Sequence, residues 1–72
     1  MNLTEDEYSV LKMLIEDGWR LPCDAATETF LKPRRIKTVP GGNETLMRLR
    51  QAAFLDNQNR ITVGGRKAFK AR

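Results

Sequence analysis

Apolar side chains recur at helical spacing along residues 5–17, where they are Tyr8, Leu11, Leu14 and Ile15. Thr4 precedes this stretch and Glu7 follows it by three positions, which is the pattern of a capping box at a helix start. Gly18 comes directly after the stretch, and glycine readily adopts the left-handed conformation that ends many helices. We therefore predict a first helix over residues 5–17.

The pattern is ambiguous between residues 19 and 42. Asp24 is placed to cap a short helix that Pro33 would end. The same segment also alternates in TETFL and is rich in β-branched residues in RIKTV, so a hairpin over residues 24–39 fits nearly as well. We favour a helix over residues 24–31 followed by an exposed basic loop or short strand, and we keep the hairpin as the alternative.

A second amphipathic stretch begins after the Pro-Gly-Gly break at residues 40–42. Its apolar stripe consists of Leu46, Leu49 and Ala53. Asn43 is suited to cap this helix, which we predict over residues 43–53. At about 100° per residue, Arg48 points directly away from the stripe. The residues that flank it on this outer face are Glu44, Thr45, Gln51 and Ala52.

The last third of the chain predicts a small β-ribbon and a further helix. Two short apolar runs at 54–55 and 61–63 are separated by DNQNR at 56–60, where Asp and Asn tolerate tight turns. Thr62 is placed to cap the helix that follows. Together the elements predict a single α+β domain over residues 1–72, with about three to four helices and a C-terminal β-hairpin.

Composition narrows the chemistry of this domain. The chain has 72 residues, one cysteine and no histidine. It therefore lacks the commonest metal ligand, the usual proton shuttle near neutral pH, and a partner for an internal disulfide. We expect no metal, no cofactor, no catalytic residue and no enzyme activity. No stretch approaches the ~20 apolar residues of a membrane span, so we expect a soluble cytoplasmic protein.

Charge is distributed unevenly along the chain. Residues 1–30 carry seven acidic and two basic side chains, whereas residues 31–72 carry eleven basic and two acidic ones. This polarity predicts a basic side whose partner is a polyanion. The alternative is that the two halves neutralise each other across the fold.

The C-terminal part of the chain resembles a known family. TLMRLRQAAFLD at 45–56 and RITVGGRKAFK at 60–70 are similar to the end of winged helix-turn-helix domains, those of MarR-like and PadR-like repressors among them. In that family a recognition helix ends in L-x-x-x-G-[FL]-[LIV], and a wing leads into [IL]-T-x-x-G-R-x-A-[LF]. Ala53 stands where the family usually has glycine. The matching residues are Leu49, Phe54, Leu55, Ile61, Thr62, Gly65, Arg66, Ala68 and Phe69.

The resemblance implies a helix in the DNA major groove with a wing beside it. Helix 43–53 would read the bases, with Arg48 contacting guanine and with Thr45 and Gln51 as secondary readers. Phosphate contacts would come from the basic loop, the wing and the tail, through Lys32, Arg34, Arg35, Lys37, Arg60 and Lys67. For any single residue of the basic loop, a solvated surface charge is the alternative. Arg66 has an internal ion pair as its alternative.

Two functional hypotheses follow. The first is a small DNA-binding protein, a transcriptional regulator of phage, prophage or plasmid type, with double-stranded DNA as its partner and a homodimer as its candidate assembly. The second is a winged-helix-like module that binds or inhibits a larger host protein, with the Pro-Gly-rich middle as its contact loop. Neither hypothesis involves a membrane.

Overall fold

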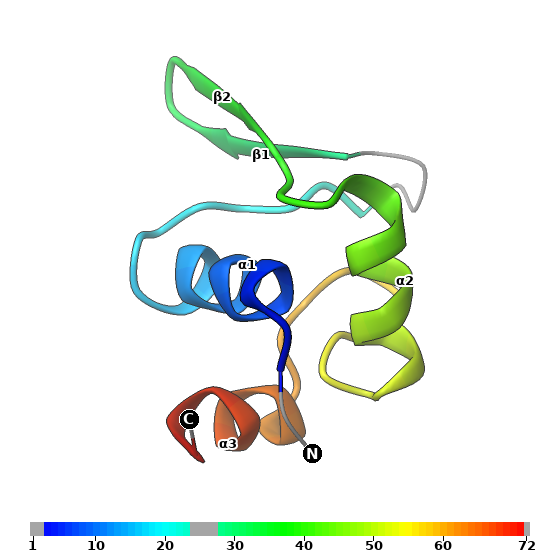
Figure 1. Ribbon diagram of the computed structural model, residues 1–72. Helices are drawn as coiled ribbons and strands as arrows, with labels where there is room; N and C mark the ends of the chain where they lie inside the picture. Colours follow the sequence, from blue (N-terminus) through cyan, green and yellow to red (C-terminus); the bar gives the residue numbers. More distant parts are fainter. Residues whose placement is uncertain (1–2, 24–27, 72) are drawn as a thin grey trace.

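The chain folds into helices and one antiparallel hairpin, so the predicted α+β class is confirmed. The computed structural model describes residues 3–23 and 28–71. Within these ranges the elements are α1 (Glu5–Ile15), β1 (Thr29–Lys32), β2 (Arg35–Thr38), α2 (Gly42–Gln51) and α3 (Val63–Ala71). Figure 1 shows α1 in the middle of the molecule, with the hairpin and α3 on opposite sides of it and α2 alongside.

The first helix forms as its sequence predicts. The Thr4 hydroxyl accepts a hydrogen bond from the Glu7 N–H, and the Glu7 carboxylate accepts one from the Thr4 N–H, which completes the capping box. Gly18 is left-handed, with φ of 76°, and the Trp19 N–H donates to the Met13 carbonyl. The last two residues of the predicted span lie beyond the helix, because α1 ends at Ile15.

The favoured short helix over residues 24–31 is wrong, and the hairpin alternative is correct. Residues 24–27 lie outside the described part of the chain, but Thr29–Lys32 form a strand that pairs with Arg35–Thr38. A strand places alternate side chains on opposite faces. Phe30 is therefore fully buried while Leu31 is exposed, and the β-branched residues of β2 suit this pairing.

The second helix forms, but Asn43 does not cap it. The N-cap is Gly41, which is left-handed with φ of 75°, and its neighbour Gly42 has φ of 63°. Two consecutive left-handed residues turn the chain sharply, and glycine adopts this conformation without a steric penalty. The helix therefore begins one residue before Asn43, whose Oδ1 is buried with no hydrogen-bond partner among the described residues.

The end of α2 is left-handed although no glycine is present. Ala53 has φ of 62°. Its N–H donates to the Arg50 carbonyl, and the Phe54 N–H donates to the Leu49 carbonyl. This pair of bonds is the Schellman motif that ends many helices. Ala53 therefore follows the apolar stripe of α2 as an exposed end residue and is not buried within it.

The predicted C-terminal wing is not confirmed. Residues 54–63 contain one isolated bridge, between Leu55 and Ile61, and Val63 already belongs to α3. The hairpin of the fold precedes α2 and spans residues 29–38. Thr62 does cap α3 as predicted, because its hydroxyl accepts from the Gly65 N–H at 3.0 Å.

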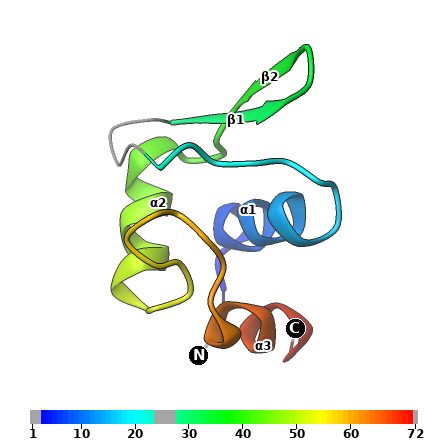
Figure 2. The same cartoon turned by 180° about the vertical axis from the view of Figure 1, so that it is seen from behind.

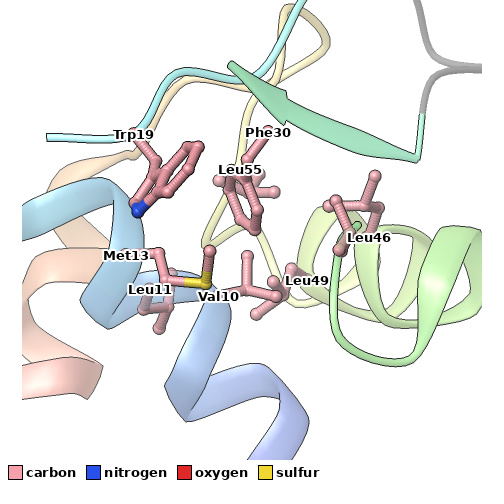
Figure 3. Close-up of a cluster of buried hydrophobic side chains, with 9 residues drawn as sticks. Val10, Leu11, Met13, Trp19, Phe30, Leu46, Leu49 and Leu55 are labelled. Carbon is pink, nitrogen blue, oxygen red and sulfur yellow. The ribbon is translucent and has the colours of Figure 1, made fainter. Parts of the chain in front are cut away.

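A single core joins the three helices to the hairpin. Figure 3 shows side chains of α1, α2 and β1 pointing toward one another. The buried residues are Val10, Leu11, Met13, Trp19, Phe30, Val39, Leu46, Leu49 and Leu55. On the far side of α1, the rings of Tyr8 and Phe69 stack with centroids 5.0 Å apart and so attach α3. Among the described residues, no helix is both long enough and apolar enough to cross a membrane.

Candidate nucleic-acid interface

The densest group of cationic side chains lies on the hairpin. We call residues 29–38 the basic hairpin, because this segment contains no acidic residue. Every residue of β2 is exposed, as are Pro33 and Arg34 at the turn. The hairpin leaves the body of the molecule at one end (Figure 1). Its cations are Lys32, Arg34, Arg35 and Lys37. The structure therefore brings together the four predicted phosphate contacts of the middle segment.

Trp19 anchors the base of this hairpin. The Lys32 Nζ lies 4.6 Å from the centroid of the indole ring, and the guanidinium carbon of Arg35 lies 5.9 Å from it. A cation over an aromatic face is attracted by the negative charge of the ring faces. Arg20 and Leu31 also exchange two backbone hydrogen bonds of 2.9 and 2.8 Å, so the chain after Trp19 pairs with the free edge of β1.

The turn of the hairpin holds an unusual backbone conformation. Arg34 has φ of 62°, in the left-handed region that favours glycine. For a residue with a Cβ this conformation costs about 1–2 kcal/mol. The preceding Pro33 restricts its own φ to about −65°, which suits the first central position of a tight turn. An arginine therefore occupies the tip of the hairpin at a cost in stability that glycine would avoid.

Only some of the predicted base-contacting residues lie on the outer face of α2. Arg48 and Gln51 are exposed, but the Arg48 guanidinium pairs with Glu44 at 2.9 Å. Thr45 is only 5% exposed, so its assignment as a base reader is wrong. The reason is helical geometry: Thr45 lies one turn before Leu49 and therefore shares the buried face with it.

The loop before α3 is held by its own polar side chains. The Asp56 carboxylate accepts hydrogen bonds from the N–H groups of Arg60, at 2.9 Å, and Gln58, at 2.8 Å. These two bonds, and then the Arg60 charge, lower the pKa of Asp56 below its ordinary value of 3.8. Asn59 is left-handed, with φ of 59°, and its amide donates to the Pro22 carbonyl while its oxygen accepts from the Arg50 Nε.

Three arginines that are distant in sequence line one open cavity of about 550 Å³. Arg20 follows Trp19, Arg60 ends the loop that Asp56 organises, and Arg66 lies in the first half of α3. Figure 2 shows the face on which the segment after Trp19 passes above the loop that leads into α3. No acidic residue lines this cavity, and no described carboxylate pairs with these three guanidinium groups.

The cationic side chains do not form one surface centred on Arg48. The basic hairpin lies on one side of α1, whereas Lys67 and Lys70 belong to α3 on the other side (Figure 1). Lys67 is exposed and is not part of the cavity lining. The internal ion pair weighed for Arg66 is absent among the described residues.

Sequence patterns missed two important positions. Arg20 lies in the acidic half of the chain and carries no motif, so only its pairing with Leu31 associates it with the basic hairpin. Asn59 was assigned to the predicted turn, but it is 3% exposed and links the loop to Pro22. The sequence could have indicated only the left-handed backbone of Asn59, because Asn in a polar turn often adopts that conformation.

Comparison of the chain with protein-family models, with curated protein sequences and with solved structures finds no match.

Proposed function

We propose that this protein binds double-stranded DNA and that the basic hairpin is its principal contact. The observation that carries the proposal is the arrangement of four cations on a two-stranded ribbon that contains no acid and whose turn and second strand are exposed. An antiparallel ribbon fits into the major groove, and Lys and Arg side chains pair with the phosphates on either side of it. The contact of Lys32 and Arg35 with Trp19 orients the ribbon relative to the body of the protein.

In this proposal α2 plays a smaller part than the resemblance implies. Arg48 remains exposed, but its ion pair with Glu44 would have to break before it could pair with guanine. Exposed ion pairs of this kind contribute about 0.3–0.5 kcal/mol, so this cost is small. Arg48 and Gln51 therefore remain candidate base contacts. The resemblance to winged helix-turn-helix repressors is the ground for proposing a regulatory role in transcription, of phage, prophage or plasmid type.

A salt titration tests the proposal. Affinity for a random-sequence duplex falls with salt in proportion to the number of phosphates that the protein neutralises. We expect the double variant Arg34→Gln/Lys37→Gln to bind more weakly and to reduce the slope of log K against log salt by about two. The measurement is fluorescence anisotropy of a labelled duplex at several salt concentrations.

The matched control removes two charges elsewhere. Lys12 on α1 and Lys70 on α3 are both exposed, so Lys12→Gln/Lys70→Gln changes the net charge equally without touching the hairpin. This variant should keep most of the affinity and nearly the full slope. Equal losses in the two double variants would show a diffuse charge effect and would contradict the hairpin assignment. Absence of any complex with the unmodified chain at low salt would reject DNA binding altogether.

One observation favours a protein partner as the second candidate. Ile36 is 75% exposed in the middle of β2 and lies opposite Leu31, which is 39% exposed, so the two form an exposed apolar pair. The change Ile36→Ser separates the two candidates. It should leave DNA affinity unchanged, whereas a protein retained from nuclease-treated lysate by the unmodified chain and lost by Ile36→Ser would support the interaction module.

A further inference from the structure

The cavity lined by Arg20, Arg60 and Arg66 also has apolar walls, which the binding of a phosphate group alone would not require. Apolar side chains also line it, and they come from α1, from the segment after α1 and from the loop before α3. They are Leu14, Trp19, Leu21 and Ile61. A cavity that combines cationic groups with apolar side chains suits an organic anion better than an inorganic ion.

We propose that this cavity binds a small phosphorylated ligand with an aromatic body, of the nucleoside monophosphate class. The guanidinium group presents a planar fork of N–H donors that matches a phosphate in a bidentate manner, and it stays charged at every physiological pH. No carboxylate lines the cavity, and the nearby Asp56 carboxylate already accepts from the backbone N–H groups of Arg60 and Gln58.

The size of the cavity agrees with this class of ligand. Its volume of about 550 Å³ falls within the range of roughly 300–1,000 Å³ that is usual for small-molecule sites. The apolar wall offers a surface for a base or another flat ring. Trp19 lines the cavity although it is only 8% exposed, and its ring also lies beneath the Lys32 ammonium.

The arginines are carried by backbone that is already held in place. The Asn59 amide fastens the loop to the Pro22 carbonyl, and the Asp56 carboxylate holds the Arg60 N–H. On the other wall, two backbone hydrogen bonds fix Arg20 to Leu31. Preorganised backbone lowers the entropy that a ligand must overcome on binding.

The cations of this site differ from those of the proposed DNA contact, although Trp19 adjoins both. The cavity uses Arg20, Arg60 and Arg66, whereas the DNA proposal rests on the cations at positions 32–37. Either proposal can therefore fail while the other holds. In particular, Arg34→Gln/Lys37→Gln should lose DNA affinity and keep nucleotide affinity.

Titration with AMP, adenosine and inorganic phosphate tests the inference. Trp19 is the single tryptophan of the chain and lines the cavity, so its fluorescence is a direct readout. We expect AMP to change the fluorescence saturably and to bind at least tenfold more tightly than either adenosine or phosphate alone. We expect Arg60→Gln and Arg66→Gln each to weaken AMP binding about tenfold, because each removes a charge-assisted pair.

The control variant and the contrary results are well defined. Lys70→Gln removes an exposed charge from the same helix as Arg66 but lies outside the lining, so it should bind AMP like the unmodified chain. Circular dichroism checks that all variants are folded. Equal affinity for AMP and phosphate, equal losses in Lys70→Gln and Arg66→Gln, or no saturable response to AMP at millimolar concentration would each overturn the inference.

Discussion

Gly65 has little room for any side chain. A Cβ at this position would collide with the carbonyl oxygen of Phe54, because α3 packs directly against the backbone that follows α2. Its neighbour Gly64 is different: a Cβ there would lie 3.6 Å from the Ala53 carbonyl oxygen, an ordinary contact. The two adjacent glycines therefore serve different purposes, although the sequence presents them as a pair.

Alanine substitution at the two glycines should separate these purposes. Gly65→Ala should destabilise the protein by about 1–3 kcal/mol, as expected when an atom is forced into a filled space. Gly64→Ala should be neutral or stabilising by up to about 1 kcal/mol, because alanine favours helices more than glycine does. Urea unfolding followed by circular dichroism measures both values. A similar effect of the two changes would contradict the close packing at Gly65.

Among the residues that the structure describes, three other than glycine have left-handed backbone, and each lies where the chain changes direction. Ala53 ends α2, Arg34 lies at the tip of the hairpin, and Asn59 lies in the loop before α3. Asparagine tolerates this conformation, whereas at alanine and arginine it lowers the stability of the fold by about 1–2 kcal/mol each. At Arg34 the cost falls on an exposed cation of the proposed DNA contact, as expected where strain accompanies a functional position.

At the scale of elements, the loop over residues 56–60 is held in part by one ionised side chain. The Asp56 carboxylate accepts from the Arg60 and Gln58 N–H groups, and these bonds lower its pKa. A lowered pKa means that the stabilising contribution is fully present above the unfolded value, near 3.8, and is lost as pH falls through the lower folded value.

A pH series should reveal this dependence. The unmodified protein should lose stability as pH falls below about 4, in part because protonation of Asp56 weakens the loop. Asp56→Asn removes the ionisable group, so the loss over the same window should be smaller. The free energy of unfolding from denaturant titrations between pH 6 and pH 2.5 gives both curves. If the two curves are parallel throughout, Asp56 does not contribute in this way.

For the whole molecule, the important fact is that the hairpin and α3 are separated by α1 (Figure 1). A rigid duplex that contacts the basic hairpin would leave the far end of α3 free. Asp6, in the acidic first turn of α1, lies close to Gly41, in the turn between β2 and α2. We therefore expect DNA to contact the hairpin end of the molecule and not the end formed by α3.

NMR titration of the ¹⁵N-labelled protein with duplex DNA tests this orientation. We expect amide shifts in residues 29–38 and at Arg20, which pairs with β1. The amides of the last turn of α3, at Lys70 and Ala71, should shift little. Shifts concentrated in α3 and absent from the hairpin would place the DNA on the wrong side of the molecule and contradict the proposal.

The sequence alone determined the local features of the helices. The capping box of α1, its glycine end, the amphipathic stripe of α2 and the Thr62 cap of α3 all follow from residues within a few positions of one another. Such signals depend on short-range geometry and short hydrogen bonds, and a linear pattern contains them. The exposed position of Arg48 and the four cations of the middle segment also followed from spacing and composition alone.

What only the tertiary structure decided is how distant segments meet. Residues 29–31 suited a strand nearly as well as the favoured helix, and burial of Phe30 against the core resolved the choice. Thr45 is buried because it shares the inner face of α2 with Leu49 and lies against Gly41 in the preceding glycine turn. The cavity with Arg20, Arg60 and Arg66 depends on a strand pairing and on the Asn59 hydrogen bond to Pro22, 37 residues away. Contacts across such separations arise from the packing of the whole chain, and no local pattern specifies them.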